Sequence, residues 1–348
     1  MRPRFAKRGW MFAVSVASLL VGLVGTPQRA HAETCITQSQ MTPADRTAIV
    51  DAARDMSMKV SIGDSAGLRA ITIKEYASNF DAIANSVAAT APHLKGAQII
   101  VRNVYILDAS SLKAGPEGSV PAAQFFCSLN NSPSDTNFTI PGLPAGKYAL
   151  AIVDAAGIAA PWQLSFVLQQ VQSKWLLAGF IPKAATAAGH NGLWYWTQAR
   201  DYGKKGERLN AWLYYQVAEQ LLVPVDFVNS TNLEKLRSEE QAVRPPAFQP
   251  APSAQHPLSL KGAKETFMVT SIGTDDALGG LDLVLHVTAT DTSDPVAARQ
   301  RDVNAMQAML AAYPEVARAF HGLWVFADAP GQNPFGIELP IGQIPASP

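Results

Sequence analysis

The segment WQLSFVLQQVQSKWLLAGFIP, residues 162–182, gives the clearest structural signal in this chain of 348 residues. It contains two runs rich in aromatic and branched apolar side chains, residues 162–170 and 174–181. Gln172 and Ser173 separate them, and polar residues between two such runs are typical of a turn. The segment therefore predicts an antiparallel β-hairpin.

The sequence before this hairpin adds helices and then further strands. Apolar residues at helical spacing, including Ile49, Ala53 and Met56, predict helices between residues 42 and 90. Residues 98–107, 122–129 and 148–155 are rich in side chains that favour strands. Helices followed by antiparallel strands indicate an α+β fold, in which a curved sheet wraps around the helices.

The two runs WQLSFVL (162–168) and KWLLAGFIP (174–182) resemble the last two strands of nuclear-transport-factor-2-like (NTF2-like, SnoaL-like) domains. The resemblance covers residues 42–183 and implies a cone of N-terminal helices on a strongly bent antiparallel sheet. It also implies a homodimer formed through the open face of that sheet. The family includes isomerases, dehydratases and non-catalytic modules, so the resemblance does not fix an activity.

Catalytic members of that family generally place an Asp and His pair, or a similar dyad, inside the cone. Here the corresponding part has one histidine, His93, beside Pro92 in a predicted loop. Asp108 and Asp154 lie at ends of predicted strands, where exposure is the default. No residue is predicted to be catalytic, and no cofactor is expected.

The first 32 residues have the composition of a cleaved secretory signal. Arg2, Arg4, Lys7 and Arg8 precede an apolar run over residues 10–24, and Ala30-His31-Ala32 follows it. The run is shorter than the roughly twenty apolar residues that span a membrane, which argues against a retained anchor. The sequence predicts a secreted or periplasmic protein with no membrane span after cleavage.

Charge excludes two classes of partner. The chain has 28 Lys and Arg against 28 Asp and Glu, and the first 32 residues carry five of the basic residues and no acidic one. Cleavage leaves 23 basic against 28 acidic residues, a net charge of −5. Nucleic acids and anionic lipids require clustered Lys and Arg, so neither is expected as a partner.

The chain has two cysteines, Cys35 and Cys127. In an oxidising compartment an even number favours a disulfide, with two buried free thiols as the alternative. Without a CxxC spacing the pair predicts neither a zinc site nor a redox motif.

Residues 192–237 carry a dense run of aromatic side chains. Ala199, Tyr202, Gly206, Ala211, Tyr215 and Ala218 reproduce the spacing of a tetratricopeptide repeat. The segment resembles one helical hairpin of that type, with its turn at Gly206 and a short third helix through Arg237.

A single hairpin of this type cannot bury its own apolar face. One alternative is that it docks on the preceding sheet domain. The other is that part of it stays exposed and binds a protein, a peptide or a small molecule, since Trp and Tyr dominate binding hot spots. The candidate binding residues are the aromatic block, defined as Trp194, Tyr195, Trp196, Trp212 and Tyr215.

These features divide the chain into a signal (1–32), an NTF2-like α+β domain (33–186), a helical hairpin with a third helix (187–240), a Pro-rich linker (241–258) and a small α+β domain (259–348). In the last domain residues 265–272, 281–289 and 323–327 predict strands, and a helix begins at Asp294-Pro295. The predicted order is ββαβ, without a family resemblance.

His286 and His321 are the only histidine pair predicted within one domain, and Asp275, Asp276 and Asp282 lie near them in sequence. The spacing is not that of a metal site such as HxxxH, so we expect hydrogen-bonded strand histidines and no metal.

Two functions remain. The first is a non-catalytic extracytoplasmic binding protein of unknown ligand. The alternative is a small-molecule enzyme, a hydrolase or an isomerase, that uses the cavity of the NTF2-like domain. The enzyme requires at least two ionisable side chains that converge in the cavity.

Overall fold

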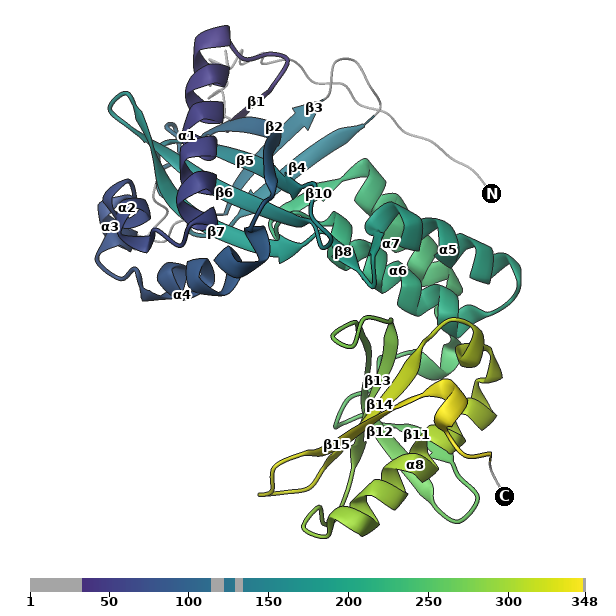
Figure 1. Cartoon of the computed structure of the whole chain (residues 1–348). Coiled ribbons are helices and arrows are strands. Elements are labelled where there is room, and N and C mark those ends of the chain that lie inside the picture. The colour runs from purple at the N-terminus through teal and green to yellow at the C-terminus, as the bar shows by residue number, and fades with distance from the viewer. Residues whose placement is uncertain (1–32, 114–121, 129–133, 347–348) are drawn as a thin grey trace, which may run out of the picture. The chain divides into compact units, whose positions relative to one another are not determined.

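The computed structural model describes residues 33–113, 122–128 and 134–346, so the predicted signal segment, residues 1–32, lies outside the described residues. In the described part helices combine with several antiparallel sheets, and the fold is α+β as predicted (Figure 1). Among the described helices, none has both the length and the apolar character needed to cross a membrane.

The first sheet has five antiparallel strands in the order β1-β2-β5-β6-β7. They are β1 (Thr34–Thr37), β2 (Gln98–Asp108), β5 (Lys147–Ala156), β6 (Trp162–Val171) and β7 (Lys174–Ala184). β6 and β7 form the predicted hairpin. Gln172 in its turn has a φ of 57°, in the left-handed region that tight hairpin turns use.

Helices cover one face of this sheet. They are α1 (Pro43–Ser61), α2 (Ser65–Ala70), α3 (Lys74–Ala77) and α4 (Asp81–Thr90). Val104 and Ile106 of β2 pack with α1 and α4, whereas Tyr105 and Leu107 pack on the opposite face, because successive strand side chains alternate.

A second sheet, in the order β10-β4-β3, packs on that opposite face. It consists of β3 (Ala123–Ser128), β4 (Asp135–Ile140) and β10 (Val228–Ser230), and the sequence had indicated β3 alone. The first sheet is therefore covered on both faces. The more specific NTF2-like cone stays a prediction.

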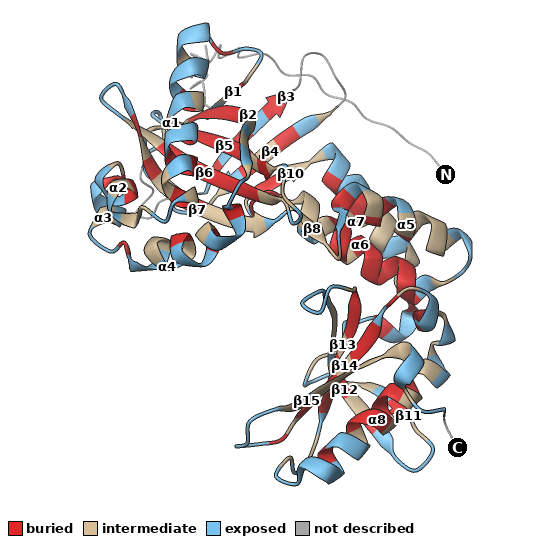
Figure 2. Ribbon diagram, viewed as in Figure 1, coloured by how far each residue is buried: buried red, intermediate tan, exposed pale blue. Residues whose placement is uncertain are grey.

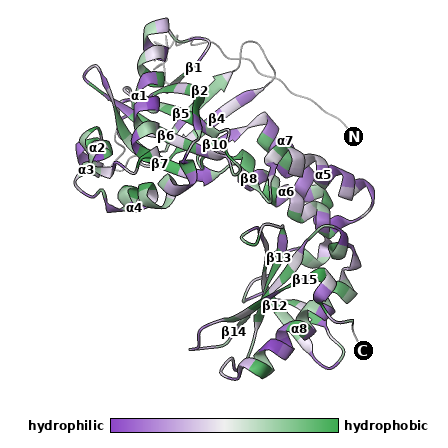
Figure 3. Cartoon of the chain, viewed as in Figure 1, coloured by the Kyte–Doolittle hydropathy of each residue, from purple (hydrophilic) through white to green (hydrophobic). Residues whose placement is uncertain are grey.

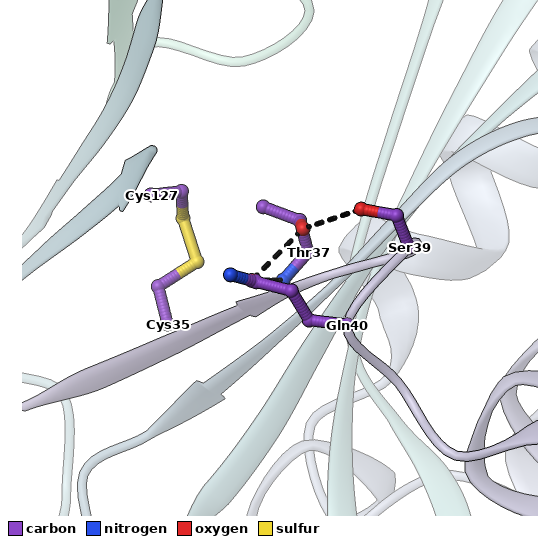
Figure 4. The surroundings of a disulfide bond; sticks show 5 residues. All are labelled: Cys35, Thr37, Ser39, Gln40 and Cys127. Carbon is purple, nitrogen blue, oxygen red and sulfur yellow. Dashed lines mark hydrogen bonds between the residues drawn. A yellow bond between two sulfur atoms is a disulfide. The ribbon is translucent and has the colours of Figure 1, made fainter. Parts of the chain in front are cut away.

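The predicted disulfide is confirmed. Cys35 in β1 and Cys127 in β3 are bonded, with Cα atoms 5.3 Å apart, so the bond joins the first sheet to the second (Figure 4). Next to it Thr37 Oγ1 donates to Gln40 Oε1 at 2.9 Å in the turn that leads to α1. A disulfide indicates an oxidising compartment.

Three helices follow the short strands β8 (Thr186–Ala187) and β9 (His190–Asn191). α5 (Gly192–Lys204) and α6 (Arg208–Leu222) form the predicted hairpin, and Gly206 in its turn has a φ of 78°. α7 (Thr231–Val243) extends beyond the predicted end at Arg237.

The C-terminal sheet has the order β11-β12-β13-β14-β15. Its strands are β11 (Leu258–Lys261), β12 (Thr266–Asp275), β13 (Asp282–Thr288), β14 (Gly322–Asp328) and β15 (Phe335–Pro340), two more than the predicted three. α8 (Pro295–Ala312), capped by Asp294 as predicted, connects the parallel strands β13 and β14.

The segment predicted as a Pro-rich linker is mainly exposed, with two buried residues, Pro245 and Phe248. It contains the end of α7 and a short 3-10 helix, Pro246–Phe248, and Phe248 is fully buried. Buried residues concentrate in the central strands and in α6 (Figure 2), and these segments are rich in hydrophobic residues (Figure 3).

Candidate functional site

The aromatic block lies mainly inside the protein. Tyr195, Trp196, Trp212 and Tyr215 are buried, whereas Trp194 is partly exposed. The buried residues belong to one hydrophobic cluster with strands β12, β13 and β14 and with α8. Four of the five predicted binding residues are thus part of a core, Trp194 is the most exposed of the five, and Trp196 keeps a small exposed edge.

The polar atoms of the buried aromatic residues in these helices have acceptors. Trp196 Nε1 donates to Glu239 (2.7 Å), Trp212 Nε1 to Glu240 (2.9 Å), Tyr195 OH to Ala187 O (2.9 Å), Tyr214 OH to Ala319 O (2.5 Å) and Tyr215 OH to Glu239 (3.1 Å). Buried Trp and Tyr with satisfied polar atoms are typical of a structural role.

Glu239 is the centre of this network. Arg200 donates to it from Nε at 2.7 Å and from Nη2 at 2.9 Å. The hydrogen bonds from Arg200 are the main cause that lowers the pKa of Glu239 to about 2, with a further contribution from Trp196 and Tyr215. Burial, together with the charge of Glu239, raises the pKa of Tyr215 to about 12.

The helical hairpin is covered mainly by the C-terminal part of the chain, and it contacts the preceding sheet, the cover that one alternative predicted, at the end of α6, where Lys183 donates to Gln220 O and Val223 O. Tyr214 stacks edge-on against Phe320 at 5.8 Å between ring centroids, and Trp212 lies 5.3 Å from Phe248. Asn210 Nδ2 donates to Glu315 O at 2.8 Å. The physical reason is that both faces of the first sheet are already occupied.

A groove lies where these helices meet the first two sheets. It encloses about 440 Å³, and its lining is mainly apolar. Apolar lining residues from five elements are Tyr105, Phe138, Leu193, Trp196, Leu222 and Leu233. An adjoining cavity of about 340 Å³ shares Arg102, Leu193 and Leu222 with the groove.

Arg102 supplies the charge of the groove. Its Nη2 donates to Gln163 Oε1 at 2.7 Å, and its Nη1 lies 3.3 Å from Asp154 Oδ1. Burial raises the pKa of Asp154, and the positive charge of Arg102 opposes that shift. The pairing of β2 and β5 shifts register at Arg102, and a bulge of this kind re-aims a side chain.

Sequence reasoning missed Arg102. The available signal was a single charged residue within the apolar run 98–107, at a position where a buried strand would be expected to be apolar.

Two other groups near these elements are engaged in structure. Lys183 Nζ donates to Gln220 O at 2.7 Å and to Val223 O, at the C-terminal end of α6. Burial lowers its pKa to about 8. The ring of His93 stacks on Trp162 at 4.8 Å.

The C-terminal histidines each pair with a different aspartate. His286 Nδ1 lies 2.9 Å from Asp328 Oδ2, and His321 Nδ1 lies 3.0 Å from Asp282 Oδ1. The structure therefore does not bring the two histidines into one site. Asp275 and Asp276 instead accept backbone N–H groups, those of Ala277 and Ala188, both at 2.8 Å.

Glu338 of β15 completes a group with Asp282 and His321. One metal-binding atom from each lies within 4.8 Å of the others. Burial and the negative charge of Asp282 raise the pKa of Glu338, while His321 opposes the shift. Glu338 was not predicted as a site residue, because its strand β15 was not predicted.

No protein-family model, no curated protein and no solved structure matches this chain.

Proposed function

We propose that this chain is an extracytoplasmic, non-catalytic binding protein whose ligand site is the groove between the helices and the first two sheets. The observation that carries the proposal is a volume of about 440 Å³ lined mainly by apolar side chains together with Arg102. Small-molecule sites typically have this size and this combination of a mainly apolar lining and a few polar groups.

The lining favours a small amphipathic molecule with an apolar body and one anionic group. Leu193, Trp196 and Leu222 provide apolar contact surface. The side chain of Arg102 is 48% exposed, and two of its nitrogens engage Gln163 and Asp154. A guanidinium has five N–H donors, so donors remain for a carboxylate or sulfonate.

The same groove argues against the alternative enzyme. A hydrolase or an isomerase needs an acid and a base near each other. Arg102 is the charged residue among the described groove residues, and its close partner Asp154 lines the adjoining cavity. An arginine side chain does not release its proton in a protein. An anion would use the remaining N–H donors of Arg102 and would compete with Asp154 for its positive charge.

A relation to NTF2-like domains is part of the proposal for residues 42–183. It is supported by the order of elements, helices α1 to α4 before an antiparallel sheet. Homodimer formation stays a prediction.

The test is a fluorescence titration with 8-anilinonaphthalene-1-sulfonate, which combines an apolar body with a sulfonate. Leu193→Asp places a charge in the groove at a residue that is 60% exposed, so the fold should tolerate it. Its matched control, Leu278→Asp, alters a 55% exposed leucine outside the groove. We expect Leu193→Asp to weaken dye binding about tenfold or more, equivalent to about 1.4 kcal/mol.

Arg102→Gln should weaken dye binding less, and Leu278→Asp should leave it unchanged. Thermal melts of all three variants establish that each is folded, because the dye also binds partly folded states. Equal dye binding by Leu193→Asp and the wild type would contradict the groove as the ligand site.

A further inference from the structure

Three side chains that can each bind a metal ion meet at one end of the C-terminal sheet. Asp282 is the first residue of β13, His321 directly precedes β14, and Glu338 lies in β15. These three strands are neighbours in the sheet. We call Asp282, His321 and Glu338 the acidic corner. It shares no residue with the groove.

The geometry of the acidic corner converges on one point. One ligand-type atom of each residue lies within 4.8 Å of the other two. A Cβ built on Gly322 would lie 2.9 Å from Asp282 Oδ1 and closer still to Glu338 Oε1. Both carboxylates therefore reach into the space that a side chain at position 322 would fill.

A glycine also gives His321 its position. A Cβ on Gly280 would lie 2.5 Å from His321 Cβ, so only glycine lets the imidazole approach the end of β13. Positions 280 and 322 thus both leave room for the acidic corner.

The polar atoms of the acidic corner are incompletely satisfied. The Asp282 side chain is 0% exposed, and its Oδ2 has no hydrogen-bond partner among the described residues. Glu338 Oε1 is likewise buried and without a partner in the described part of the chain. A buried carboxylate oxygen without a partner costs free energy, so the site as folded is incomplete.

A cation satisfies this arrangement better than a proton does. The hydrogen bond between His321 and Asp282 uses one carboxylate oxygen, and an added proton would supply a donor to one more. A divalent ion accepts electron pairs from both carboxylates and the imidazole at once, and it removes the repulsion between the two negative charges.

We propose that Asp282, His321 and Glu338 bind one divalent transition-metal ion, for which zinc is the best match. Zinc accepts imidazole nitrogen and carboxylate oxygen at about 2.0–2.2 Å, which places neighbouring ligand atoms about 3.3 Å apart in a tetrahedron. His321 Nδ1 and Asp282 Oδ1 are 3.0 Å apart, close to this spacing, and the ligand atoms of all three residues lie within 4.8 Å of one another, so Glu338 would move by about 1–2 Å at most. Three protein ligands leave a fourth position for water or an exchangeable ligand.

The test is a calorimetric titration with zinc chloride at pH 7. The protein keeps its disulfide, and a chelator removes bound metal beforehand. We expect saturable binding of about one ion per chain. Glu338→Gln keeps the size of the side chain but removes its charge, and it should weaken zinc binding about tenfold or more. Asp282→Asn should have a similar effect.

The matched control is Asp328→Asn, which removes the carboxylate of the other His–Asp pair in the same sheet. It should bind zinc like the wild type. Zinc should also raise the melting temperature of the wild type and of Asp328→Asn equally, and that of Glu338→Gln by less at the same zinc concentration.

Absence of saturable zinc binding would overturn the proposal. An equal loss of zinc affinity in Glu338→Gln and Asp328→Asn would overturn it as well, because it would indicate adventitious binding to surface histidines. Magnesium chloride should not raise the melting temperature, since magnesium prefers ligand sets made of oxygen alone.

Discussion

The buried aromatic residues of the helical hairpin and the carboxylates of the acidic corner leave their buried polar atoms in opposite states. In the hairpin the indole nitrogens of Trp196 and Trp212 donate to carboxylates. In the acidic corner Asp282 Oδ2 and Glu338 Oε1 have no partner among the described residues. The comparison teaches that aromatic density alone does not identify a site. Whether buried polar atoms are satisfied is the more informative criterion.

Truncation of a side chain in the aromatic core should have the largest effect on the free energy of unfolding. Trp212→Ala leaves a cavity and removes the donor to Glu240, so it should lower the free energy of unfolding by about 4 kcal/mol. Urea denaturation followed by circular dichroism measures this loss. A variant that keeps its stability but loses ligand binding would show that Trp212 acts at a surface, which would break the comparison.

Disruption of the hydrogen-bond network at Glu239 should have the second-largest effect on the free energy of unfolding. Glu239→Gln weakens hydrogen bonds from Arg200, Trp196 and Tyr215 and should cost about 2 kcal/mol at pH 7. Glu234→Gln, an exposed change in the same helix, is the control and should cost less than about 0.5 kcal/mol.

The pH dependence of the Glu239→Gln effect gives an independent check. Because the folded pKa of Glu239 is about 2, below its ordinary value of 4.5, the ionised form stabilises the fold above pH 4.5. This stability is lost as the pH falls towards 2. The difference between Glu239→Gln and the wild type should therefore shrink from pH 7 to pH 3, and a constant difference would contradict the network.

Asp302 gives a second test, because its carboxylate lacks hydrogen-bond partners among the described residues although Arg301 Nε lies 3.6 Å from its Oδ1. Both of its carboxylate oxygens are buried without a hydrogen-bond partner among the described residues, and burial raises its pKa to about 7 against the opposing charge of Arg301. We expect a proton, rather than a ligand, to neutralise it. With a raised folded pKa, its stabilising protonated form is fully present below pH 3.8 and is lost as the pH rises through 7.

Asp302→Asn should remove this loss and should stabilise the chain at pH 8 by on the order of 1 kcal/mol relative to the wild type. Urea denaturation at pH 5 and pH 8 measures it. Equal stability differences at the two pH values would show that Asp302 stays ionised.

Trp194 should show the smallest effect. It is partly exposed and stacks on His190 with ring centroids 3.6 Å apart. Trp194→Ala should cost about 0.5–1 kcal/mol in the same urea experiment. A loss of stability as large as that of Trp212→Ala would mean that Trp194 is as much a core residue as Trp212. The distinction between an exposed Trp194 and the four buried residues of the aromatic block would then fail.

The sequence predicted those elements that are specified by a few residues adjacent in the chain. The hairpin of β6 and β7, the turn at Gly206 and the cap at Asp294 each depend on a few neighbouring side chains. Seven short strands, β1, β4, β8, β9, β10, β11 and β15, were missed, because each has six residues or fewer and carries little local signal. β1 and β10 are in addition held by pairing with strands distant in sequence. Within the predicted linker, Phe248 is buried against Trp212 and Tyr313, two contacts with residues distant in sequence that local pattern does not indicate.

The candidate sites were harder to predict than the fold. The aromatic block suggested a binding surface because the sequence cannot show that the C-terminal sheet covers it. Arg102 reaches the groove through a register shift between β2 and β5. Glu338 meets His321 only because β15 pairs with β14. Each of these contacts is set by tertiary packing rather than by local spacing.

The most direct measurement is anomalous diffraction at the zinc edge from crystals of the chain grown with zinc. If buried polar atoms without partners mark a ligand site, the strongest zinc peak will lie in contact with Asp282, His321 and Glu338. Zinc peaks at other histidines, such as His190 or His256, with none at the acidic corner would contradict the account.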